Sequence, residues 1–317
     1  MAAAPLSPAA VPMPPRAIAM DGVAWAMLVL LAVLWGGSFV LVEVILTALP
    51  VMTLVALRVL LAACTLWMVV LALGLRLPRQ SGIYARFLVL GLFNNAVPFL
   101  LIVWGQTAIT AGLAAILNVT TPLFAALIAG VFLADERLTR TRVGGIVLGL
   151  MGVTVMIGPA ALLTLGQDVM HQLAVVGASL SYGISAVYAR RFLRLDVPPL
   201  IVATGQLTAS SLILVPTALL VDGVAFVGVP AGVWVAVLAN ACLSTALAYI
   251  LYFRIVARAG ATNATLVTVL VPVVAILVGA LVLGERLGAP QFAGMALIFA
   301  GLMVIDGRLL RRRRAAT

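Results

Sequence analysis

The sequence predicts an all-α integral membrane protein with ten transmembrane helices, arranged as two inverted five-helix repeats. Three observations predict this fold: the composition, the placement of the arginines and an internal repeat. Of the 317 residues, 65% are hydrophobic and only 9% are charged, whereas a soluble domain carries about 25% charged residues. Because so few charges cannot cover a water-facing surface, we expect lipid to be the solvent of this chain.

Ten apolar stretches approach the length of a membrane span, which needs roughly 20 residues at about 1.5 Å each. They do not alternate between apolar and polar residues, as the strands of a membrane barrel do. The fifth and tenth stretches are short. The stretches cover residues 23–42, 51–73, 87–103, 113–133, 143–157, 173–189, 200–221, 233–253, 264–283 and 292–305.

The arginines predict the orientation of these spans. All 19 basic residues are arginines, and all but Arg58 and Arg286 fall in segments that face one side if spans alternate. Because short cytoplasmic loops carry an excess of basic residues, we expect both termini in the cytoplasm, in a bacterial inner membrane. Residues 1–20 are then a disordered cytoplasmic tail, and residues 307–317 are a basic cytoplasmic tail.

The composition also excludes several function classes. Without lysine, the chain lacks the residue required by a P-loop phosphate site or a Schiff base. Its arginines form short clusters between apolar runs rather than one basic face, which argues against a nucleic-acid partner. One histidine, His171, and two cysteines, Cys64 and Cys242, predict neither a metal site nor a cofactor.

A motif of Glu-Arg-Leu followed by two glycines occurs twice, with 149 positions between corresponding residues. We therefore assign residues 21–158 and 170–306 to two repeats. Because each has five spans, an odd number, the second copy enters the membrane in the reverse sense, a common plan in secondary transporters. The copies are Glu136-Arg137-Leu138 with Gly145 and Gly152, and Glu285-Arg286-Leu287 with Gly294 and Gly301.

On these features the chain resembles the EamA family of the drug/metabolite transporter superfamily. The resemblance extends from residue 23 to residue 306. It implies transport of amino acids, related metabolites or drugs, often outward, with protons as a candidate coupling ion. The residues that carry it are Leu34-Trp35-Gly36-Gly37-Ser38-Phe39, Leu57-Arg58, Pro122, Pro272, Asp135-Glu136-Arg137-Leu138 and Gly284-Glu285-Arg286-Leu287.

The repeat and the resemblance together predict a secondary transporter that exports small metabolites by alternating access. The expected partners are a small-molecule substrate and the lipid bilayer, with the chain a monomer or weak homodimer. A passive channel or facilitator is the main alternative, because it too needs a polar path. An intramembrane enzyme is disfavoured, since His171 has no evident nucleophile beside it.

Arg58 is the main candidate for substrate binding. It lies roughly 12 Å inside the second span at about 1.5 Å per residue. Because an arginine at mid-membrane costs at least about 2.5–3.5 kcal/mol on insertion scales, it should face a cavity or a partner. A carboxylate substrate and Glu43 are both candidate partners, and snorkelling toward headgroups is the structural alternative.

Other polar and aromatic side chains within the spans are candidates to line a cavity, although interhelical hydrogen bonds would also explain the polar ones. Prolines within or near spans are hinge candidates, with static kinks as the alternative. No acid lies near mid-membrane, so a coupling residue is not assigned. The cavity candidates besides Arg58 are Trp35, Ser38, Asn94, Asn118, Tyr182, Gln206, Asn240, Tyr249 and Thr268, and the hinge candidates are Pro98, Pro122 and Pro272.

Overall fold

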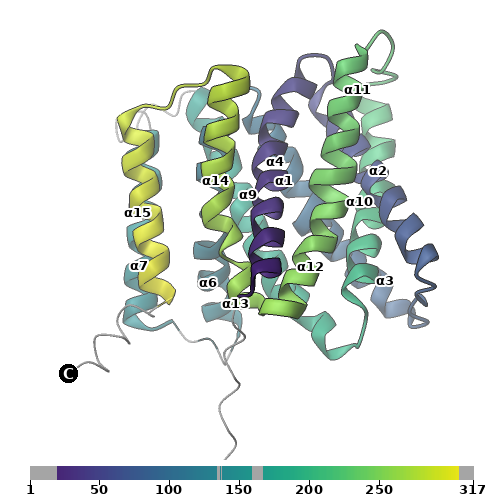
Figure 1. The fold of residues 1–317 in the computed structure, drawn as a ribbon, viewed down its shortest axis with the longest axis horizontal. Coiled ribbons are helices and arrows are strands. Elements are labelled where there is room, and N and C mark those ends of the chain that lie inside the picture. Colours follow the sequence, from purple (N-terminus) through teal and green to yellow (C-terminus); the bar gives the residue numbers. More distant parts are fainter. Residues whose placement is uncertain (1–19, 134–135, 137, 159–166, 307–317) are drawn as a thin grey trace, which may run out of the picture.

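The computed structural model describes residues 20–133, 136, 138–158 and 167–306, and every regular element in this part of the chain is helical. The helices run side by side, up and down through one bundle (Figure 1). Eight are long and apolar enough to cross a membrane, and two shorter apolar helices cover Val267–Leu283 and Ala289–Ile305. The all-helical membrane fold predicted from the sequence is therefore confirmed for the described residues.

The first half contains five helical segments, of which the third and fourth are irregular. A π-helical segment interrupts the third, and a break at residues 119–120 divides the fourth. Their bounds are α1 Gly22–Leu46, α2 Val51–Ala72, α3 Ser81–Gly91, η1 Leu92–Ala96, α4 Val97–Gly105, α5 Ala111–Asn118, α6 Thr121–Phe132 and α7 Arg140–Ile157.

The second half repeats this order, including a π-helical segment in its third helix and a break in its fourth. Each of the ten apolar stretches lies in one of these helices or helix pairs, but length and hydropathy support eight as spans, so the count of ten stays a prediction. The bounds are α9 Gln167–Ala189, η2 Arg190–Arg194, α10 Pro199–Val221, α11 Ala231–Leu238, η3 Ala239–Leu247, α12 Ala248–Ala259, α13 Ala261–Ala264, α14 Val267–Val278, η4 Gly279–Leu283 and α15 Ala289–Asp306.

The last helices of the two halves, α7 and α15, pack against each other at one edge of the bundle (Figure 1). A Cβ atom at Gly145 would lie 2.7 Å from the carbonyl oxygen of Gly301, and one at Gly152 would lie 2.6 Å from that of Gly294. Since Gly145 corresponds to Gly294 and Gly152 to Gly301, exchanging the halves converts one contact into the other. This self-complementary pairing makes the helices antiparallel, as inverted repeats require.

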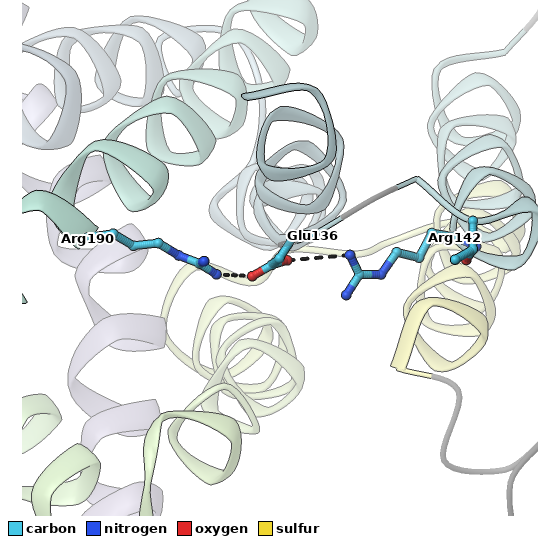
Figure 2. A network of polar contacts seen from close by, with 4 residues as sticks. Glu136, Arg142 and Arg190 are labelled. Carbon is cyan, nitrogen blue, oxygen red and sulfur yellow. Dashed lines mark hydrogen bonds and ion pairs between the residues drawn. The ribbon is translucent and has the colours of Figure 1, made fainter. Parts of the chain in front are cut away.

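The helix ends carry polar contacts that differ between the two ends of the bundle. At the end that we name the arginine end, Asp21 pairs with Arg258, and Glu136 pairs with Arg142 and Arg190. The Arg258 guanidinium, with help from the backbone N–H of Ala24, lowers the pKa of Asp21 to about 2. Figure 2 shows the second group, with the two arginines reaching Glu136 from opposite sides.

At the opposite end, which we name the Glu285 end, Thr53 donates to Asp222 through its backbone N–H, over 2.8 Å, and its hydroxyl, over 2.7 Å. Glu285 accepts from the first turn of α5 there. The loops therefore alternate between the ends in chain order, as alternating spans require. The predicted tails lie outside the described residues, apart from Met20.

The glycine contacts between α7 and α15 predict an unequal effect of two neighbouring substitutions. Gly145→Ala places a methyl group against the Gly301 carbonyl, and such overpacking costs about 1–3 kcal/mol. Gly144→Ala is the control, because a Cβ at Gly144 meets nothing within 4 Å and gains the same helix propensity. We expect G145A alone to lower the melting temperature in detergent; equal melting of both variants would contradict the packing.

Candidate functional site

Arg58 lies in the interior of the bundle, although it carries a full charge. Only 8% of its surface is exposed. Its Nε donates to the Thr245 hydroxyl over 3.0 Å, and its guanidinium carbon lies 3.9 Å from the centroid of the Phe99 ring. A cation over an aromatic face is stabilised by roughly 2 kcal/mol when water is excluded. Among the described residues, no ion pair joins this guanidinium to a carboxylate.

The π-helical segments η1 and η3 supply much of the polar surroundings. Pro98, in the first turn of α4, has no N–H for the carbonyl of Asn94, and at the end of η1 the Val97 N–H reaches the carbonyl of Leu92 in the wider π-helical pattern. In η3, the Thr245 hydroxyl donates to the carbonyl of Asn240 over 2.9 Å. The two segments begin at equivalent points of the two halves, 147 residues apart. Such π turns often occur at functional sites because they redirect side chains.

Asn94 is the centre of a side-chain network beside η1. Its Nδ2 donates to Gln206 Oε1 and to the Tyr249 hydroxyl, each over 3.1 Å. Its Oδ1 accepts from the Ser185 hydroxyl over 2.8 Å. The Tyr249 hydroxyl in turn donates to Asn95 Oδ1 over 3.0 Å. Four segments, η1, α9, α10 and α12, are therefore joined through one amide.

Two tyrosines connect this network with Arg58. Tyr249 belongs to the network directly, and the carbonyl of Tyr182 accepts from the Ser185 hydroxyl over 2.9 Å, while the Tyr182 ring packs against the same apolar core as Phe99. Around them, Tyr249 stacks on Phe253 with ring centroids 6.2 Å apart, and Tyr252 lies tilted against Trp35 with ring centroids 5.8 Å apart. We name the whole set the central cluster. Its members are Arg58, Asn94, Asn95, Phe99, Tyr182, Ser185, Gln206, Asn240, Thr245 and Tyr249.

Two asparagines of the central cluster have polar atoms without hydrogen-bond partners. Asn240 is 1% exposed and both of its side-chain polar atoms are unpaired, and the Nδ2 of the fully buried Asn95 is also unpaired. Leaving such a group unsatisfied costs about 1–3 kcal/mol, so native structures rarely contain them without a reason. The cluster therefore holds one cationic group and, within the part of the chain that the structure describes, three amide atoms without a hydrogen-bond partner.

Outside the central cluster lie four predicted cavity residues, Trp35, Ser38, Asn118 and Thr268. Trp35 packs against Tyr252 at the edge of the cluster, and the other three form hydrogen bonds of their own. The hydroxyl of Ser38 donates to the carbonyl of Trp35, and that of Thr268 to the carbonyl of Thr265, each within its own helical turn. Asn118 accepts at the break between α5 and α6, from Thr121 and Ser179. The hydroxyls of Ser38 and Thr268 thus satisfy backbone carbonyls of their own turns, whereas the side chain of Asn118 accepts from two hydroxyls. Sequence position alone does not reveal these partners.

The three hinge candidates occupy different positions. Pro98 follows η1, Pro122 lies in the first turn of α6, and Pro272 lies inside α14. Only the first has an evident local effect, the π turn of η1. Whether any of them bends during transport stays a prediction.

Glu43, which the sequence analysis offered as a partner of Arg58, lies elsewhere. It shares the backbone N–H of Ala111 with Glu285, over 3.3 Å against 2.7 Å for Glu285. The sequence alone does not reveal this contact, because Glu43 and Glu285 are 242 residues apart, nor the contact of Arg58 with Phe99, because it depends on how two helices pack. The Arg58–Glu43 pair is therefore absent from the structure.

In the part of the chain that the structure describes, a surface groove and the search for metal ligands both leave the central cluster aside. Among the described residues, no group of three or more His, Cys, Asp or Glu side chains is placed to hold a metal ion. A groove of about 310 Å³ lies between α2 and α10, where Leu60, Cys64 and Trp67 line it with mostly apolar atoms. Its lining includes no residue of the central cluster, so it adds nothing to the candidate site.

Comparison with known proteins gives consistent relatives. A probable terminal-alkyne amino-acid exporter of Streptantibioticus cattleyicolor is 30% identical over 92% of this chain and 96% of its own length. A probable amino-acid metabolite efflux pump of Salmonella typhimurium is 28% identical over 89% and 95%. An uncharacterized transporter of Bacillus subtilis, YoaV, is 24% identical over 88% and 95%. All three are named as transporters, exporters or pumps, not as enzymes.

A solved crystal structure has the same fold, with a TM-score of 0.65 and 22% identity over 92% of this chain and 99% of that one. The model of the EamA-like transporter family matches residues 22–158 and again residues 170–306. The apolar helices and this double match make the chain a multi-pass membrane protein built for transport. It belongs to the EamA-like transporter family.

Proposed function

We propose that this chain is a secondary transporter that exports amino acids or related carboxylate metabolites by alternating access. The relatives named as amino-acid exporter and amino-acid metabolite efflux pump support this cargo and direction. The observation that carries the proposal is Arg58, a buried cation without a carboxylate partner among the described residues.

A carboxylate substrate would neutralise this cation inside the bundle. An unpaired guanidinium in the membrane interior costs several kcal/mol, and a substrate carboxylate accepts its hydrogen bonds in a bidentate geometry. The unpaired Oδ1 of Asn240 would accept from a substrate ammonium group, and the unpaired Nδ2 atoms of Asn95 and Asn240 would donate to carboxylate or carbonyl oxygens. A zwitterionic amino acid presents this combination of groups.

The topology that we propose has ten spans, both termini in the cytoplasm and the arginine end at the cytoplasmic face of a bacterial inner membrane. The excess of arginine at that end supports it through the positive-inside rule. Residues 21–158 and 170–306 act as the two repeats that rock against each other. The prolines Pro98, Pro122 and Pro272 are the proposed hinges, and protons are the candidate coupling ion.

Replacing Arg58 tests the proposed site. Truncating one partner of a buried charge pair costs about 2–5 kcal/mol, so Arg58→Ala should weaken substrate binding by at least about tenfold. The measurement is protection of growing cells against a panel of toxic amino acids and their analogues. Arg254→Ala, which removes an exposed arginine, is the matched control. Full protection by R58A, at an expression level equal to that of R254A, would refute the role of Arg58.

Counterflow separates a carrier from a passive channel. In proteoliposomes loaded with an amino acid that cells are protected against, uptake of labelled amino acid should be faster than in empty vesicles. The physical reason is that a loaded binding site returns across the membrane in exchange. A channel has no such exchange step, so equal uptake by loaded and empty vesicles would favour the channel.

Labelling from each side of the membrane tests the inverted topology. Single cysteines replace Arg140 and Arg286, both exposed positions. One of them should react with an impermeant maleimide only in intact cells, and the other only in inverted vesicles. The reason is that the two Glu-Arg-Leu motifs lie at opposite ends of an inverted pair. Reaction of both cysteines from the same side would contradict this topology and the alternating-access proposal with it.

A further inference from the structure

The two halves of the protein have the same helix order but differ in the packing of their fourth helices. In the first half, α5 is buried, with Ala111 and Ala114 0% exposed and Ala115 1% exposed. In the second half, Ala261 and Thr265 are exposed, and Leu266 is 37% exposed. The prolines that follow, Pro122 and Pro272, are 150 residues apart, one more than the Glu-Arg-Leu motifs, and at this spacing Ala111 matches Ala261 and Ala115 matches Thr265. Ala264 is the one fully buried residue of α13 among those whose burial is described.

The helix contacts of α5 and α13 show the same difference as their burial. The buried segment α5 packs on α1, α9 and α14, which includes both halves of the protein. The exposed segment α13 makes its main contacts with α12, the helix directly before it in the chain. The Glu285 end of the bundle is therefore closed around α5, whereas the arginine end is not closed around α13.

The repeated glutamates differ as well. Glu285 accepts from the backbone N–H groups of Ala111 and Gly112, over 2.7 and 3.0 Å, and so caps the first turn of α5. Its counterpart Glu136 instead binds Arg190 and Arg142, the latter over 3.5 Å (Figure 2). One copy of the motif thus contacts the fourth helix of the opposite half, whereas the contacts that the structure describes for Glu136 are with arginines.

The first turn of α5 is shaped for this contact. A Cβ at Gly112 would lie 3.2 Å from Glu285 Oε2, and one at Gly279 would lie 2.6 Å from the same atom. The side chain of Thr110 accepts from the Leu113 N–H, so Glu285 supplies acceptors for the two N–H groups before it. A carboxylate is stabilised at a helix N-terminus by the unpaired N–H groups and the helix dipole.

We propose that the contact of Glu285 with the first turn of α5 is a latch that holds the Glu285 end shut, and that each transport cycle releases it. The proposal rests on alternating access, because inverted repeats exchange their conformations when the access side changes. In the released state α13 and the segment after it become buried as α5 is here, and α5 becomes exposed to water. Glu136 then breaks its ion pairs with Arg142 and Arg190. It contacts the fourth helix of the second half at the arginine end, as Glu285 contacts α5 at the Glu285 end here.

Cysteine accessibility in the full-length protein tests the latch without a substrate. Cys64 and Cys242 are first replaced by alanine, and a single cysteine is placed at Ala115 or at Thr265. The protein is held in nanodiscs, where a hydrophilic maleimide reaches both faces. We expect the cysteine at Thr265 to react quickly and the one at Ala115 to react slowly, as their exposure indicates.

Breaking the latch should reverse this pattern. Glu285→Ala removes the carboxylate, and Gly279→Ala displaces it by a steric clash while leaving it in the sequence. With either change, we expect the reaction at Ala115→Cys to become severalfold faster and the reaction at Thr265→Cys to become slower. Opposite changes at the two sites are the signature of exchange between two states, which simple loosening of the fold does not produce.

The matched control is Glu136→Ala, which removes the repeated glutamate that caps no helix here and should leave Ala115→Cys protected. If E285A fails to fold, G279A carries the test alone. Unchanged protection at Ala115→Cys, or faster reaction at both sites, would overturn the latch. The labelling experiment measures no transport, so its outcome is independent of the R58A test. If the labelling pattern reverses but R58A still transports normally, the latch is retained and the proposed substrate site is rejected.

Discussion

The need to satisfy every backbone polar group inside the chain governs this structure. In lipid, no water is present to pair a free N–H or C=O group, so spans are helical. Irregular segments and breaks within the spans therefore mark positions that have a role besides crossing the membrane. They are the π-helical segments η1, η3 and η4, the break between α5 and α6, and the break before α14. The first two border the central cluster, and the breaks divide the helices whose packing differs between the halves.

Helix packing without a hydrophobic driving force is the second constraint. In a bilayer, helices associate through close contact and polar groups rather than by exclusion of water. Glycines of α7 and α15 bring two backbones to a separation that no Cβ allows. In the repeat, Gly145 corresponds to Gly294 and Gly152 to Gly301. The residues that permit the close approach are therefore also equivalent positions of the two inverted halves.

Electrostatics distinguishes the interior from the two ends. At the arginine end, Glu136 is partly exposed and its pairs with Arg142 and Arg190 contribute about 0–1 kcal/mol each. In the interior, Arg58 has a hydroxyl and an aromatic ring as neighbours and no carboxylate among the described residues. The same residue type thus serves topology at the surface and, as we propose, recognition in the centre. The difference lies in the solvent around the guanidinium, since water screens the surface charges and is excluded from the interior.

The sequence by itself determined the membrane solvent, the approximate places of the helices and the two repeats, because these depend on composition, run length and spacing along the chain. It also selected Arg58, Asn94, Gln206, Asn240 and Tyr249, since a polar side chain in an apolar run needs a reason wherever the run packs. Only the tertiary structure decided their partners. It placed Phe99 under Arg58, sent Glu43 to Glu285 instead, and left Ser38, Asn118 and Thr268 to local hydrogen bonds. These contacts join segments more than a hundred residues apart or depend on the rotation of each helix about its axis, and the order of residues along a uniformly apolar helix does not fix that rotation.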